Sequence, residues 1–138
     1  MNIKRLGIGS VVGTIVLYLL GMLIWVVLFA DFFDANSGSA TGVDRETPIM
    51  WAVIVGTLFY AVLLTLVLES GGASKSLADG LKTGAIVGAL LWGTADFVLF
   101  GFTNLSTLTG TVADTLLEGV RGGIAGGIIA AVLGKIGD

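Results

Sequence analysis

The chain has 138 residues, of which 55% are hydrophobic and 12% are charged, and its mean hydropathy is +1.00. Because soluble domains carry about 25% charged residues, this composition indicates an all-α integral membrane protein with a single transmembrane domain over residues 1–138. The absence of Cys and His excludes disulfides, thiolate chemistry and His-containing zinc sites, and no basic stretch points to a nucleic-acid partner.

Four apolar runs are each close to the ~20 residues that a helix needs to cross a bilayer. They cover residues 7–30, 48–68, 81–102 and 111–133. The first follows Lys4 and Arg5, as in a signal peptide, but it is longer than the usual ~7–15 apolar residues and no small-residue cleavage site follows. We therefore expect it to be a retained helix. The second begins with Pro48 in its first turn, where proline is tolerated.

The distribution of Lys and Arg predicts the orientation of these spans, because cytoplasmic segments carry an excess of basic residues. The first loop, residues 31–47, has Arg45 against four acidic residues. Both chain ends and the segment between the second and third spans are more basic. Their basic residues are Lys4, Arg5, Lys75, Lys82 and Lys135. We therefore expect an antiparallel four-helix bundle with both termini in the cytoplasm.

Glycine recurs every fourth residue in the last two spans. The rows are Gly80, Gly84 and Gly88 in the third span, and Gly119, Gly123 and Gly127 beside Gly122 and Gly126 in the fourth. Small residues at this spacing form a groove on one helix face and let two backbones approach closely. We expect the third and fourth spans to pack tightly, because the turn between them is short. A homodimer face is the alternative use of these rows, and both uses are compatible.

Ionisable residues inside the last two spans are the candidate functional site. Asp114, Glu118 and Arg121 are spaced i, i+4, i+7 and share one face of the fourth helix. At ~1.5 Å per residue, Asp96 on the third span lies between the levels of Asp114 and Glu118, and Asn104 lies above them in the turn. Charged groups inside a bilayer are costly and normally face a partner or a polar cavity.

One guanidinium cannot neutralise three carboxylates in this cluster. Either one acid holds a proton, or a cation or water joins the cluster. One interpretation is a structural latch, in which Arg121 pairs with Glu118 and with Asp96 across the helix interface. The other is a binding site for a polar ligand, ion or proton. Both interpretations remain open from the sequence.

Other polar residues of the spans have ordinary structural interpretations. Glu69 is expected to be a solvated carboxylate at the end of the second span, and Asp79 resembles a helix cap before the third. Tyr60 is expected to pack with its hydroxyl bonded. Trp92 is expected to pack inside the bundle, whereas Trp51 fits an anchor at the interface.

Three short stretches and one single residue carry a family resemblance. They are Gly21-Met22-Leu23-Ile24-Trp25 leading into Leu28-Phe29, then Asp79-Gly80-Leu81-Lys82-Thr83-Gly84, then Asn104-Leu105-Ser106-Thr107-Leu108, and the residue Asp114. The chain thus resembles the small bacterial and archaeal membrane proteins catalogued as domain of unknown function seventeen sixty-one. Members typically have four transmembrane helices, and many carry Tyr and Pro where this chain has Val26 and Val27. The resemblance implies an architecture and a prokaryotic inner membrane, and no chemistry.

We expect a non-enzymatic membrane protein that binds a partner protein, a lipid or a small solute through the polar cluster. No catalytic residue, metal site or cofactor is predicted. The partners expected are the lipid bilayer and a homodimer or larger membrane complex. The alternative is a proton- or cation-coupled transporter, or a channel-like homo-oligomer, in which Asp96 and Glu118 exchange protons or bind a cation beside Arg121. Four helices leave little room for a pore, so transport favours an oligomer.

Overall fold

The computed structural model describes residues 2–72 and 76–136, and the segment around Lys75 that entered the orientation argument lies outside them. Within the described residues every regular element is helical. Four helices are long and apolar enough to cross a membrane. These observations confirm the all-α class and agree with a membrane protein. The spans are α1 (Ile3–Gly21) with its π-helical continuation η1 (Met22–Leu28), α3 (Met50–Ser70), α4 (Leu77–Phe102) and α5 (Leu108–Ile136); a short helix, α2 (Ala30–Ala35), follows η1.

The helix boundaries differ from the hydropathy boundaries because polar residues cap the helices. Ser76 caps α4 by accepting a hydrogen bond from the Asp79 backbone N–H at 3.4 Å. The expectation that Asp79 is the cap was therefore wrong: Asp79 lies in the first helical turn, where its charge still suits the helix dipole. Asn2 caps α1 in the same way, accepting from Lys4 N–H at 3.0 Å.

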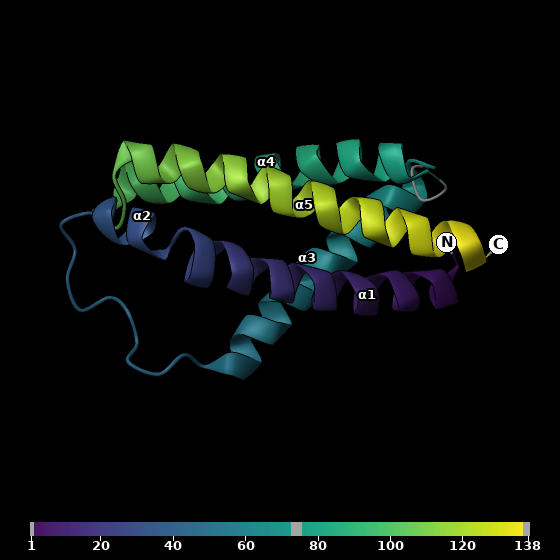
Figure 1. Ribbon diagram of the computed structural model, residues 1–138, viewed down its shortest axis with the longest axis horizontal. Helices are drawn as coiled ribbons and strands as arrows, with labels where there is room; N and C mark the ends of the chain where they lie inside the picture. The colour runs from purple at the N-terminus through teal and green to yellow at the C-terminus, as the bar shows by residue number, and fades with distance from the viewer. Residues whose placement is uncertain (1, 73–75, 137–138) are drawn as a thin grey trace.

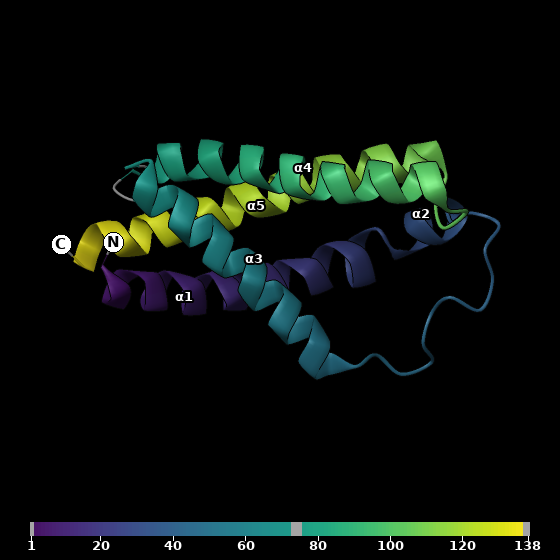
Figure 2. The same ribbon diagram turned by 180° about the vertical axis from the view of Figure 1, so that it is seen from behind.

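The helices lie roughly lengthwise, and both chain ends are at the same end of the molecule (Figures 1 and 2). α4 and α5 run side by side, and α1 lies against α3 and α5. α3 crosses the others obliquely, close to them near its C-terminal end and apart from them near its N-terminal end (Figure 2). From residue 50 to residue 59, Thr57 is the one buried position of α3.

The α4–α5 contact is made by backbone against backbone. A Cβ added to Gly84 would overlap the Gly122 carbonyl oxygen, and a Cβ added to Gly122 would overlap the Gly84 carbonyl oxygen. The second glycine row of α5 also faces α4, with Gly119 beside Ala89. The predicted tight packing is confirmed. Both glycine rows of α5 are thus filled by α4 of the same chain, which leaves neither for a second copy.

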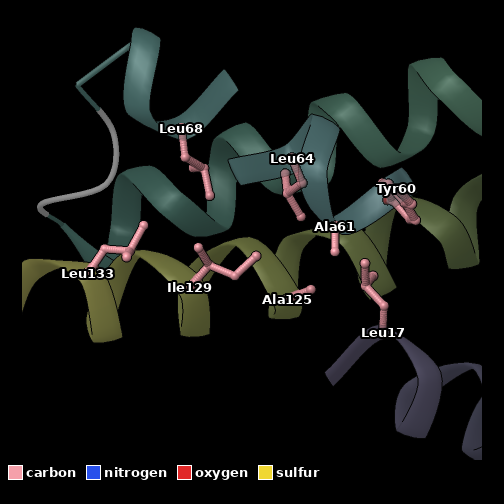
Figure 3. Close-up of a cluster of buried hydrophobic side chains, with 8 residues drawn as sticks. All are labelled: Leu17, Tyr60, Ala61, Leu64, Leu68, Ala125, Ile129 and Leu133. Atoms are coloured by element: carbon pink, nitrogen blue, oxygen red, sulfur yellow. The ribbon is translucent and has the colours of Figure 1, made fainter. Parts of the chain in front are cut away.

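The apolar core lies where α1, α3 and α5 meet (Figure 3). Its fully buried side chains share an aliphatic character, and Tyr60 closes the cluster at one end. Gly13 allows this meeting, because a Cβ there would lie 3.0 Å from the Ala61 Cβ. The cluster consists of Leu17, Tyr60, Ala61, Leu64, Leu68, Ala125, Ile129 and Leu133.

An ion pair near the chain termini ties the same three helices together. Arg5 donates from Nε and Nη2 to the two carboxylate oxygens of Glu69, each at 2.9 Å, and from Nη1 to the Leu133 carbonyl oxygen at 2.9 Å. The Glu69 side chain is only 14% exposed. The expectation that Glu69 is a solvated carboxylate was therefore wrong, because Arg5 on α1 reaches it from 64 residues away.

Candidate functional site

Arg121 on α5 is the centre of the candidate site. It is buried, and its Nη1 donates to Glu118 Oε1 at 2.9 Å, one helical turn away. Its Nε donates to the Leu17 carbonyl oxygen on α1 at 2.9 Å. The guanidinium carbon also lies over the rings of Trp25, at 5.4 Å, and Tyr60, at 5.9 Å. One side chain therefore contacts α1, η1, α3 and its own helix, and cation–π attraction adds to the ion pair.

The end of α1 is shaped to receive this guanidinium. A Cβ at Gly21 would lie 3.0 Å from Arg121 Nη2, so a small residue is needed there. The π-helical segment η1 begins at the next residue, and π-helical turns occur frequently at functional sites. Within η1, Trp25 donates its indole N–H to Asp114 Oδ1 on α5. The sequence did not predict that η1 is π-helical, because a continuous apolar run looks the same in an α-helix and in a π-helix.

The five predicted site residues fall into two groups and one outlier. Glu118 and Arg121 form the ion pair described above. Asp96 and Asp114 form a second group, because both line one cavity, and Asp96 Oδ2 accepts from Thr115 Oγ1 at 3.0 Å. Within the described residues, neither Asp96 nor Asp114 bonds to Arg121, so the predicted Asp96–Arg121 pair is not formed.

Asn104 lies apart from the carboxylates. It is exposed in the α4–α5 turn, and its backbone carbonyl oxygen accepts from Ala40 N–H at 3.0 Å. The contact arises because the segment after α2 runs against this turn, with Gly38 N–H donating to the Leu105 carbonyl oxygen at 3.0 Å. The turn therefore uses the backbone of Asn104 to dock the first loop.

A cavity of about 340 Å³ lies at the end of the molecule opposite the termini. Among the described residues, four carboxylates and no Lys or Arg line it; we call it the acidic cavity. The carboxylates are Asp34, Asp44, Asp96 and Asp114, accompanied by the polar side chains of Asn36, Ser37, Ser106 and Thr111. The sequence argument missed Asp34 and Asp44 because a loop has no periodicity that would place its side chains. The acidity of that loop was the available signal.

Several buried polar atoms around the ion pair have no hydrogen-bond partner within the described residues. They include Glu118 Oε2, Tyr60 Oη and Trp92 Nε1. The expectation of a bonded Tyr60 hydroxyl was therefore wrong, although Trp92 does pack against the core as expected. Buried polar atoms are normally paired, so these atoms call for an explanation.

The acidic residues do not converge as metal ligands do. Among the residues that the structure describes, no group of three or more Asp or Glu side chains is placed to hold a metal ion. The arrangement instead offers spaced carboxylates around a volume larger than a bare ion. Comparison of the chain with protein-family models, with curated proteins and with solved structures found no match.

Proposed function

We propose that this protein is a non-enzymatic integral membrane protein that binds a small organic cation in the acidic cavity. The observation that carries the proposal is the lining of this cavity, to which the described residues contribute four carboxylates, those of Asp96 and Asp114 among them, and no basic side chain. Several carboxylates around one cavity favour a bound proton or cation, because like charges in a poorly solvated site repel each other. An amine fits the spacing better than a metal ion, which needs converging ligands.

Arg121 favours binding over conduction. Its guanidinium lies beyond the acidic cavity, near the middle of the 29-residue helix α5, and is fixed there by Glu118 and the Leu17 carbonyl oxygen. A fixed positive charge on the path raises the barrier for a second cation. A cation that enters the acidic cavity is therefore expected to leave by the same side.

The test is a calorimetric titration, in which putrescine is added to the protein in lipid nanodiscs and the heat of binding is measured. We expect saturable binding that weakens at least tenfold in Asp96→Asn and in Asp114→Asn, and that weakens as salt rises. Asp79→Asn, an exposed acid at the other end of α4, is the matched control and should bind as the wild type does. Tighter binding of Ca²⁺ than of putrescine, or equal loss in the control, would contradict the proposal.

A proton- or cation-coupled transporter is the second candidate. Glu118 Oε2, one helical turn from Asp114, is buried with no hydrogen-bond partner in the described part of the chain, and a relayed proton could be held there. Transport predicts that Asp96→Asn abolishes flux in proteoliposomes while the fold persists. Simple binding predicts no flux in the wild-type protein.

We also propose an antiparallel bundle in a prokaryotic inner membrane, with both termini cytoplasmic and the acidic cavity facing outward. The position of both termini at one end supports this orientation, and so do Lys82 and Lys135. The motifs quoted above support membership of domain of unknown function seventeen sixty-one. The chain lacks Cys, so single variants Ser39→Cys and Ser70→Cys can be labelled with a membrane-impermeant maleimide in intact cells. The proposed orientation predicts labelling of Ser39→Cys alone. Labelling of Ser70→Cys alone would show that the orientation is the opposite one.

A further inference from the structure

A second recess lies on the flank of the bundle, where α3 diverges from α4 (Figure 2). It has two adjoining parts of about 300 Å³ and 260 Å³, which share Gly56, Tyr60 and Trp92 as lining residues. We call it the lateral crevice. The first part also reaches Arg121, whereas the second is lined otherwise by apolar side chains such as Phe59 and Leu91.

Arg121 lines the lateral crevice and has one nitrogen without a hydrogen bond in the described residues. Its Nε and Nη1 are bonded to Leu17 and Glu118, but within the described residues Nη2 makes no hydrogen bond. The side chain remains 11% exposed and lines the crevice. Trp92 also lines it and has an N–H without a partner in the described chain. Such donors are expensive to leave unpaired where water is scarce.

The charge of the site restricts the chemistry of an occupant. Glu118 already neutralises Arg121 at 2.9 Å, so an anion would leave an excess negative charge in the hydrocarbon region, and a cation would meet the guanidinium. A neutral hydrogen-bond acceptor fits both the open donors and the charge balance. Tyr60 and Trp92 add aromatic walls that suit a flat ring.

The depth of the site restricts the occupant further. Arg121 lies near the middle of α5, below the level at which ester carbonyls of phospholipids reside. A part of about 300 Å³ is at the lower end of ligand-pocket sizes, which suits one ring, and the adjoining apolar part suits a hydrocarbon tail. We propose that the lateral crevice binds a lipid-soluble quinone, with the ring carbonyl oxygens accepting from the Arg121 guanidinium and from Trp92 Nε1 and with the tail beside Phe59.

Gly56 supplies a variant that blocks the site without disturbing the fold. A Cβ at Gly56 would meet no atom within 4 Å, although the residue lines both parts of the lateral crevice. Gly56→Leu therefore places a side chain into the recess. Gly101→Leu is the matched control, because Gly101 is equally open and lines neither part.

The experiment measures binding of a decyl-substituted 1,4-benzoquinone to the protein in nanodiscs, with empty nanodiscs subtracted. We expect saturable binding that falls at least tenfold in Gly56→Leu and about fivefold in Trp92→Phe, which removes one hydrogen bond, while Gly101→Leu binds as the wild type does. The decyl dimethoxybenzene analogue, which lacks carbonyl oxygens, should bind at least tenfold more weakly. Equal binding of the analogue, tighter binding of decanoic acid, or unchanged binding in Gly56→Leu would each overturn the proposal.

Discussion

Glu118 and the Leu17 carbonyl oxygen would each lose a hydrogen-bond donor if Arg121 were replaced. Its partner Glu118 is buried, and the two side chains are 11% and 5% exposed. Breaking a buried pair leaves one charge uncompensated, whereas replacing both members by apolar groups often costs little. A single substitution in the pair should therefore destabilise the fold more than replacement of both residues does.

Arg121→Met should lower the free energy of unfolding by about 3–5 kcal/mol, because it leaves Glu118 charged and unpaired. The double variant Arg121→Met with Glu118→Leu should recover most of that loss. Denaturant unfolding in mixed micelles, followed by circular dichroism, measures both. If the double variant is as unstable as the single one, the pair contributes through its contacts to Leu17 and Trp25 rather than through charge compensation.

Tyr60→Phe should change the unfolding free energy by less than about 0.5 kcal/mol, or raise it. Its hydroxyl is buried with no partner in the described chain, and removing an unsatisfied group releases a desolvation penalty. The same micelle unfolding assay applies. A loss of about 1 kcal/mol or more would mean that the hydroxyl has a partner such as a bound water.

At the residue scale the sequence predicted the helix face that carries the charges and the Arg121–Glu118 pair, but not the partners of Asp96 and Asp114. Asp114, Glu118 and Arg121 do share one face of α5, because helical spacing alone determines this. Within the described residues Asp96 accepts from Thr115 and lines the acidic cavity with Asp114, and it is not bonded to Arg121, because its partners depend on the rotation of α4 about its axis. No local pattern encodes that rotation.

At the scale of elements, α4 and α5 behave as one unit whose contact surface is mostly backbone. Glycine spacing predicted this unit, because the i, i+4 rule describes a helix face directly. The spacing did not predict that α3 leans away from the bundle. Its residues are apolar all round, as a lipid-facing helix requires, so hydropathy cannot indicate which part of α3 contacts protein.

Gly122→Ala should be destabilising by about 1–3 kcal/mol, because the new Cβ overlaps the Gly84 carbonyl oxygen and two backbones must separate. Gly119→Ala on the same helix is the control: its Cβ would lie 3.4 Å from the nearest atom, an ordinary contact, and alanine is the better helix former. Thermal unfolding of the two variants in one detergent compares them. Similar unfolding midpoints for Gly122→Ala and Gly119→Ala would show that the α4–α5 contact has room for a Cβ at Gly122.

At the scale of the whole molecule, two charged side chains tie α1 to the rest of the bundle at two levels. Arg5, at the start of α1, reaches Glu69 and the Leu133 carbonyl oxygen. Arg121 reaches back to the Leu17 carbonyl oxygen near the other end of α1. The partners of Arg5 lie 64 and 128 residues away, which explains why the sequence marked Arg5 only as a flanking charge.

Arg5→Lys should lower the free energy of unfolding by about 1–3 kcal/mol, although it keeps the charge. A single ammonium cannot reproduce the two parallel bonds to Glu69 together with the bond to Leu133. Lys4→Arg, a change between the same two residue types at the exposed neighbouring position, is the control and should be neutral. Equal stability of Arg5→Lys and wild type would show that charge alone maintains this contact.

The bond from Arg121 to Leu17 joins the last span of the chain to the first, and this has a consequence for biogenesis. α5 has the lowest mean hydropathy of the four spans, 1.6 against 2.6 for the first, and it carries Asp114, Glu118 and Arg121. A ribosome delivers α1 to the membrane long before α5 emerges. The Leu17 carbonyl oxygen, beside Gly21, is therefore made before the guanidinium that donates to it. We predict that α5 inserts less efficiently when α1 is deleted than when it is present, which a glycosylation-mapping assay of α5 insertion would measure.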